Sequence, residues 1–227
     1  MIVIENLEKS FKFASGEDKV LDGINLSLDT GKITALKGVS GSGKSTLLTI
    51  IAGLQPASRG SIYLDDVELT KLSENQLRKR RASQFGFIFQ QSHLIPFLSV
   101  KDQLSFMIDT AGRDWNRKQR EEKIDKMLEA VDLMKHKHSD PNNLSGGEKQ
   151  RVAIARALIH EPEILFADEV TANLDSKRSI QVMEIIRNVT RQRSITVLMV
   201  THDEEMLVYA DRIVTMKDGK ILELNTI

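Results

Sequence analysis

The stretch "ITALKGVSGSGKSTLLTIIAGL", Ile33 to Leu54, decides the fold. Its apolar start predicts a buried strand at Ile33–Gly38, and its end predicts a helix at Lys44–Leu54. Between them, "GVSGSGKS" has the spacing G-x-x-x-x-G-K-[ST] in the strand-to-helix setting that this motif requires. Glycines let a backbone wrap closely around phosphates, and the N–H groups at a helix start attract anions. We therefore expect a phosphate-binding loop in an α/β fold; the alternative is a Gly/Ser turn before an ordinary helix.

The polar residues of this loop have separate expected roles. Lys44 can reach the terminal phosphates of a nucleoside triphosphate, and the Ser45 hydroxyl can bind Mg²⁺. The backbone and side chains expected to surround the phosphates are Gly38, Ser40, Gly41, Ser42, Gly43, Lys44 and Ser45.

Two adjacent acids, Asp168 and Glu169, follow the apolar run Ile164–Ala167. A buried central strand that ends at the phosphates would have this pattern. Its end would place Asp168 near the shell of Mg²⁺ and Glu169 near the attacking water. A pair of surface acids at a strand end is the alternative.

Short apolar runs alternate with helical patterns along the chain. Strands are expected at Phe85–Gln90, Glu163–Asp168 and Ile195–His202, with helices between them such as Ser176–Gln192. Strands that are apolar on both faces and separated by helices indicate a parallel sheet covered on both sides. Alternating polarity in the first thirty residues and in "GSIYLDDVEL" predicts a small antiparallel sheet beside it.

Between Gln91 and Asn143 the strand signal disappears, and apolar residues recur at helical spacing. The apolar stripe of the longer helical segment consists of Ile124, Met127, Leu128, Val131 and Leu133. We therefore expect a core in two parts, residues 1–90 and 148–227, with a helical subdomain at residues 91–147.

The composition limits the classes of function. The 32 basic and 32 acidic residues balance, which argues against nucleic acid or an anionic membrane surface as the main partner. Without cysteine the chain has no disulfide, no thiolate zinc site and no cysteine nucleophile. The N-terminus does not resemble a secretory signal, and no window approaches the roughly 18 apolar residues of a transmembrane helix. A function at a membrane would therefore require a separate membrane chain.

The stretch "LSGGEKQR", Leu144 to Arg151, contains a second potential anion-binding helix start. Ser145 can cap the helix, and Gly146 and Gly147 leave its first N–H groups accessible. Because the phosphate loop already serves one nucleotide, the economical hypothesis is that this second site contacts nucleotide held by another copy. A flexible loop before a helix is the alternative.

In this order, the motifs resemble the ATP-binding-cassette (ABC) ATPases over essentially the whole chain. The resemblance implies a P-loop NTPase (RecA-like) core, ATP and Mg²⁺ as cofactors, and two cassettes closing head to tail around two ATP. It extends the phosphate loop to Thr46, makes Asp168 a support of Mg²⁺, and makes Glu169 the general base or water-orienting residue. The chain departs from the family in having Val170 where Pro usually follows the acid.

The resemblance implies roles for four further residues. Gln90 in "FIFQQ" would be the switch glutamine that senses Mg²⁺ and the transmembrane partner, and His202 in "VTHD" would contact the γ-phosphate. Asp175 in "NLDS" would belong to the loop that communicates across the dimer, and Phe11 would stack on adenine. Simpler alternatives are a polar strand end for Gln90, a core histidine for His202, a helix cap for Asp175 and core packing for Phe11.

The segment "ELTKLSENQLRKRRASQFGFIFQQSHLIPFLSV" resembles the ABC group of macrolide efflux, lipoprotein release, antimicrobial-peptide resistance and cell division. Within this group, "GFIFQQSHLIPFLSVKDQL" is similar to ATPases of Gram-positive haem-efflux systems. This implies the ATP-hydrolysing subunit of a membrane exporter or mechanotransmission complex. The subunit would be peripheral at the cytoplasmic face of the cell membrane, and its permease would dock between Gln90 and Phe97. A soluble ABC ATPase of a cytosolic assembly system and a regulator of a cell-division complex remain alternatives.

Overall fold

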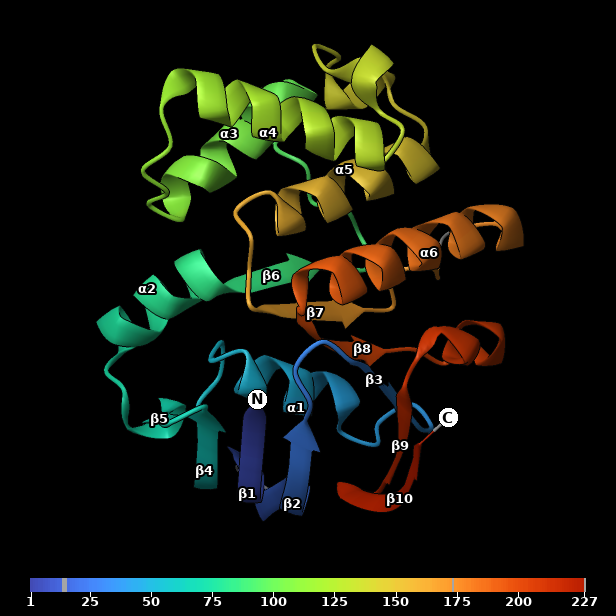
Figure 1. Cartoon of the computed structure of the whole chain (residues 1–227). Helices are drawn as coiled ribbons and strands as arrows, with labels where there is room; N and C mark the ends of the chain where they lie inside the picture. Colours follow the sequence, from blue (N-terminus) through green and yellow to red (C-terminus); the bar gives the residue numbers. More distant parts are fainter. Residues whose placement is uncertain (14–15, 173, 227) are drawn as a thin grey trace.

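The computed structural model describes residues 1–13, 16–172 and 174–226. Within these ranges the chain forms a six-stranded sheet, a four-stranded sheet and six α-helices. The elements lie in layers, with α3 and α4 farthest from the four-stranded sheet and the six-stranded sheet between them (Figure 1). The predicted α/β fold class is confirmed.

The six-stranded sheet has the order β10-β9-β3-β8-β7-β6. Its strands are β3 (Ile33–Lys37), β6 (Phe85–Ile88), β7 (Ile164–Asp168), β8 (Thr196–Val200), β9 (Arg212–Lys217) and β10 (Lys220–Thr226). Neighbours from β9 to β6 run parallel, whereas β10 pairs antiparallel with β9. The four strands expected from apolar runs are confirmed, but the antiparallel edge strand was not predicted.

Both faces of the parallel strands are buried, because successive side chains of a strand point to opposite sides. On β7, Leu165 and Ala167 pack with the helices, while Ile164 and Phe166 pack with α1 (Lys44–Ile51) and the four-stranded sheet. This two-sided burial explains why the strands read as continuous apolar runs and not as alternating ones.

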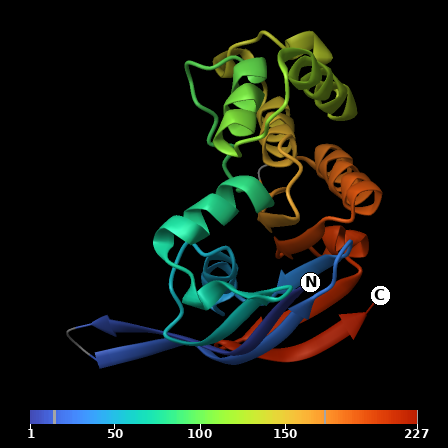
Figure 2. The same ribbon diagram turned by 60° about the vertical axis from the view of Figure 1, so that its left-hand side comes forward.

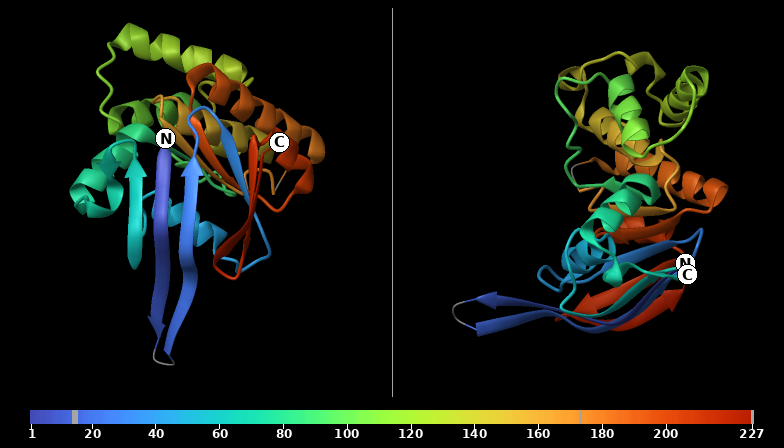
Figure 3. Two further views of the ribbon diagram at one scale, coloured as in Figure 1. Left: turned by 60° about the horizontal axis from the view of Figure 1, so that its bottom comes forward. Right: turned by 90° about the vertical axis from the view of Figure 1, so that its left-hand side faces the viewer.

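The four-stranded sheet confirms the antiparallel prediction. Its order is β2-β1-β4-β5, formed by β1 (Ile2–Phe13), β2 (Gly16–Leu28), β4 (Arg59–Leu64) and β5 (Val67–Glu68). β1 and β2 extend as a long pair past the other strands (Figures 2 and 3). The inner face of this sheet packs under α1 and shares a core with it.

The remaining helices cover the other side of the six-stranded sheet or flank it (Figure 1). They are α2 (Glu74–Gln84), α3 (Val100–Thr110), α4 (Arg117–Ala130), α5 (Gly146–Leu158) and α6 (Ser176–Arg193), with 3-10 helices at Leu69–Lys71, Met134–His136, Pro141–Asn143 and Glu204–Tyr209. The stripe expected on α4 and just beyond it is buried. No helix in the described ranges is long and apolar enough to span a bilayer.

The core beside the acid pair depends on Phe166, which is 1% exposed and contacts two further rings. Its ring centroid lies 5.5 Å from that of Phe85 and 5.4 Å from that of Phe87. We expect Phe166→Ala to reduce the free energy of unfolding by about 3–5 kcal/mol, because it leaves a cavity in a packed core. Denaturant unfolding would measure this loss.

The matched control is Phe106→Ala, since Phe106 is 50% exposed on α3. Its cost should stay below about 1 kcal/mol. Equal losses for the two variants would contradict the packing argument.

Candidate functional site

The phosphate loop has a backbone that only glycine can form. Gly38, Gly41 and Gly43 have φ values of 153°, 81° and 95°. A Cβ on Gly38 would lie 2.2 Å from the Met216 carbonyl oxygen, and one on Gly43 would lie 2.9 Å from that of Val20. Gly43 is also the N-cap of α1 and brings no side-chain cap to its first N–H groups. These donors point to the loop, as an anion-binding helix start requires.

Lys44 lies across the loop. Its Nζ donates to the carbonyl oxygens of Gly38 at 2.8 Å and Val39 at 2.9 Å, and it lies 3.4 Å from Ser42 Oγ. Phosphate oxygens that enter the loop would therefore compete with two backbone carbonyls for the ammonium group.

A cavity of about 440 Å³ lies over the loop. It is lined by Val20, Gly38, Ser40, Gly41, Gly43, Lys44, Ser45, Thr46, Glu169, Val200 and His202. The structure thus brings the loop together with Glu169 and His202, from strands far away in sequence. Ser42 lies beneath the lining and is 2% exposed. Val20 was not predicted, because an apolar residue in an alternating strand carries no signal of a site.

Glu169 and His202 form a close pair at the carboxyl ends of β7 and β8. His202 Nδ1 lies 2.8 Å from Glu169 Oε2, and the carboxylate raises the pKa of His202 above its usual 6.5. Glu169 has a φ of 49° and donates its backbone N–H to the Val200 carbonyl at 3.0 Å. The His202 side chain is 70% exposed, so the core-histidine alternative is wrong.

Asp168 is the last residue of β7 and is only partly accessible. Its Oδ1 atom is buried and accepts no hydrogen bond from the residues that the structure describes. Burial, with the nearby charge of Glu169, raises the pKa of Asp168, and Lys44 acts in the opposite direction. A buried carboxylate oxygen without a donor is costly unless a cation or proton compensates it. A carboxylate oxygen in this state fits the ligand chemistry of Mg²⁺.

Ser145 caps α5 in a reciprocal arrangement with Glu148. Its Oγ and N lie 2.8 Å and 2.9 Å from Glu148 Oε2, and these bonds lower the pKa of Glu148 to about 2. The carboxylate is therefore ionised, and it engages the hydroxyl that was expected to contact nucleotide.

Arg178 connects two of the predicted motifs, a link that the sequence did not indicate. A Cβ on Gly147 would lie 2.8 Å from Arg178 Cδ, so the arginine packs directly on the glycine. Arg178 Nη1 also lies 3.1 Å from Asp175 Oδ2, while Asp175 Oδ1 accepts the Arg178 backbone N–H at 2.9 Å. Asp175 is thus the N-cap of α6, as its alternative reading expected.

The family model described as ABC transporter matches residues 21–172. The chain belongs to the ABC transporter family.

Relatives match this ABC cassette over nearly its full length. HrtA of Staphylococcus aureus (strain bovine RF122 / ET3-1), named provisionally as a hemin import ATP-binding protein, is 41% identical over 98% of this chain and 99% of its own. The ATP-binding cassette MJ0796, in a dimeric post-hydrolysis state bound to ADP and Pi, matches with a TM-score of 0.91 and 33% identity over 100% and 98% of the two chains. CbiO1 of Clostridium perfringens, part of the cbiONQ transporter complex, gives 0.88 and 29% over 99% and 88%. This chain is therefore an ABC ATPase that binds ATP.

Several predicted residues of the ABC cassette do not line the cavity over the loop. Among the described residues, these are Phe11, Gln90, Ser42, Ser145, Gly146, Gly147, Asp168 and Asp175. A second cavity of about 220 Å³ is lined by Gln90, Gln91, Ser92, Gly146, Lys149, Gln150, Val170 and Leu174. Phe11 lies half-buried on β1 with Lys9 Nζ 5.0 Å from its ring centroid.

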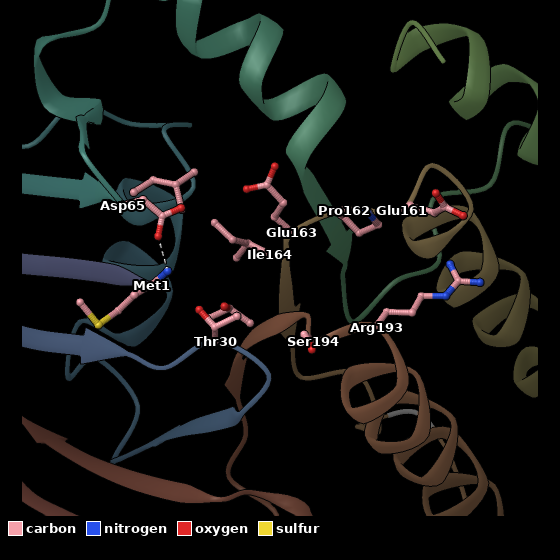
Figure 4. A pocket seen from close by; sticks show the side chains of 11 residues that line it. Met1, Thr30, Asp65, Glu161, Pro162, Glu163, Ile164, Arg193 and Ser194 are labelled. Atoms are coloured by element: carbon pink, nitrogen blue, oxygen red, sulfur yellow. Dashed lines mark hydrogen bonds and ion pairs between the residues drawn. The ribbon is translucent and has the colours of Figure 1, made fainter. Parts of the chain in front are cut away.

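A larger cavity of about 580 Å³ lies at the opposite end of the parallel strands, where β7 and β8 begin (Figure 4). Its acids already have partners: Asp65 pairs with the Met1 amine at 2.7 Å, and Glu163 accepts from Gln84 at 2.8 Å. Ligands of open α/β sheets bind outside the carboxyl ends of the strands, so this cavity is not the ATP site of the ABC cassette.

The Glu169–His202 pair makes a prediction about pH. A raised histidine pKa means that the pair stabilises the folded chain below pH 6.5, and that this contribution is lost as the pH rises through the raised value. Glu169→Gln removes the carboxylate, so it should return the pKa of His202 toward 6.5. An NMR titration of the histidine rings would measure this, with His202→Gln identifying the signal. An unchanged pKa in Glu169→Gln would contradict the pairing.

Proposed function

We propose that this ABC ATPase is the motor subunit of a membrane complex, which pairs head to tail with a second copy and drives a separate permease. One observation carries the proposal: the phosphate loop and the acid–histidine pair share one cavity, while the second anion-binding helix start lies outside it. A site divided in this way is complete only when the Ser145 region of another copy covers the nucleotide. The relative MJ0796 is described as dimeric with nucleotide bound, which supports this arrangement.

Polar groups in and beside the cavity carry the proposed chemistry. The loop N–H groups and Lys44 bind the phosphates, and Glu169 orients or deprotonates the attacking water. His202, held by Glu169, donates to the γ-phosphate. Ser45, Gln90 and Asp168 would hold Mg²⁺, which neutralises phosphate charge.

Two further predicted residues, Phe11 and Asp175, have proposed roles outside the cavity. Phe11 stacks on the adenine with the ring face that Lys9 does not cover. Asp175, tied to Gly147 through Arg178, lies where it can link the two sites of a dimer.

We retain the division into residues 1–90, 91–147 and 148–227 as a functional one; the last boundary falls inside α5.

The segment from Gln90 to Phe97 is our proposed docking site for the permease, and we propose that the protein works at the cytoplasmic face of the membrane. The Phe97 ring is 84% exposed, and an exposed large apolar group of this kind is typical of an interaction site. The turn beneath it is fixed, because the buried Gln103 amide bonds to Ile95 N, Ile95 O and Leu98 O at 3.2, 2.9 and 3.3 Å.

We propose haem or another hydrophobic compound as the transported molecule, and efflux as the direction. The substrate is supported by the hemin in the name of the relative HrtA. That name specifies import, whereas the resemblance to haem-efflux and macrolide-efflux ATPases favours efflux. The two directions predict opposite phenotypes, which makes them separable by experiment.

Glu169→Gln should bind ATP, because the phosphate loop stays intact. It should hydrolyse ATP at least about a hundredfold more slowly, because the attacking water loses its base, and it should therefore accumulate as a closed dimer. Steady-state ATPase assays and size-exclusion chromatography with ATP would measure these effects. The control is Glu163→Gln, an acid of the larger cavity away from the site, which should hydrolyse ATP at the normal rate. Normal turnover in Glu169→Gln would refute the role of this acid.

Affinity purification from detergent extracts should recover an integral membrane permease, and Phe97→Ala should reduce that recovery because the docking ring is lost. The control is Phe106→Ala on α3. Recovery without any membrane protein would instead favour the cytosolic assembly function, and a cell-wall hydrolase partner would favour the cell-division function.

In cells lacking the protein, efflux predicts increased sensitivity to hemin; failure to use hemin as an iron source would favour import.

A further inference from the structure

One buried side chain joins the two segments that carry Gln90 and Glu169. Gln150 is 4% exposed and lies in the second turn of α5. Its Nε2 donates to the carbonyl oxygens of Phe89 at 3.2 Å and Val170 at 3.1 Å. Both hydrogens of the amide are used, and each acceptor is the direct sequence neighbour of a proposed site residue.

The hydrogen bonds of Gln150 lie just beyond the carboxyl ends of β6 and β7. β6 and β7 pair in parallel as far as Ile88 and Ala167, and beyond that point no backbone ladder joins the two strands. The next residues lead into the Gln90 segment and the Glu169 segment. Beyond the last paired residues, the Gln150 amide therefore joins the two segments in place of backbone hydrogen bonds. Their relative position at this point matters for catalysis.

The same helix holds the Gln90 segment at a second point. Arg156 donates from Nη1 to the His93 carbonyl and from Nη2 to the Ser92 carbonyl, each at 2.7 Å. Since α5 begins at the Ser145 cap, one rigid helix connects the proposed contact with the partner's nucleotide to both catalytic segments. A buried polar group with satisfied bonds specifies one arrangement of the elements it joins.

A cavity lies directly beside the link. The space of about 220 Å³ is bounded by Gln90 and Ser92 on one side, by Gly146 and Gln150 of α5 on another, and by Val170 on a third. A Cβ on Gly146 would meet no atom within 4 Å. The start of α5 therefore borders open space, and Gln150 joins α5 to both segments beside it.

We propose that Gln150 is a positioning residue, which sets the Gln90 and Glu169 segments against α5 and couples hydrolysis to engagement of the partner's nucleotide. The inference deepens the proposed function and rests on its assignment of Glu169 and Gln90. Gln150 does not line the cavity over the phosphate loop, so its loss should affect turnover and not the binding of ATP.

Gln150→Met tests this, because methionine has a similar size but no donor. We expect kcat to fall about 10- to 100-fold, since a displacement of about 1 Å in a catalytic group has that effect. The Kd for ATP should change less than about twofold, and cooperativity in ATP should decrease. ATPase assays of the full chain and titration with a fluorescent ATP analogue supply the readouts.

Thr190→Val is the matched control for loss of a buried hydrogen bond. Thr190 is 2% exposed on α6 and donates from Oγ1 to the Ile186 carbonyl at 2.7 Å. The Thr190→Val variant should have a lower thermal stability but an unchanged kcat. If Gln150→Met does not fold, Gln150→Asn retains the amide one methylene shorter and should show the same selective fall in kcat.

A folded Gln150 variant with normal kcat and cooperativity would overturn the proposal, and so would an equal fall in kcat for Thr190→Val. Failure of the proposed function has a different signature, because Glu169→Gln would then keep its turnover whatever Gln150 does.

Discussion

The cost of burying a carboxylate at the end of a central strand is the constraint on which this site depends. Among the described residues Asp168 Oδ1 has no hydrogen-bond donor, and burial opposes its ionised form. Lys44 reduces this cost by supplying positive charge from the phosphate loop, whereas the neighbouring charge of Glu169 adds to it. The parallel sheet brings these groups to one edge, because β7 ends beside β8, and β8 lies beside β3, which leads into the phosphate loop.

Patterns local in sequence predicted the parts of this structure that depend on local physics. The apolar runs of β3, β6, β7 and β8 and the glycine spacing of the loop identified the α/β core and most of the cavity lining. Contacts between distant segments could not be found in this way. Val20, Arg178 and Gln150 act through neighbours that are adjacent only after folding, and β10 is an edge strand whose partner is set by the turn after β9.

The residue at position 170 shows how a departure from the family pattern is accommodated. Val170 is 3% exposed and packs with the helices on one side of the six-stranded sheet. Its carbonyl oxygen accepts from Gln150, which is a bond that proline could also accept, since proline lacks only the donor. The segment after Glu169 is thus fixed by its side-chain packing and its carbonyl, and valine fulfils both requirements.

The two carbonyl bonds of Lys44 have a consequence for the free energy of nucleotide binding. A ligand that draws the ammonium away from Gly38 and Val39 must return at least the bonding that these carbonyls supply. A triphosphate chain contacts the N–H groups along the loop and at the start of α1 as well as the lysine. Part of its binding free energy therefore offsets the two carbonyl bonds.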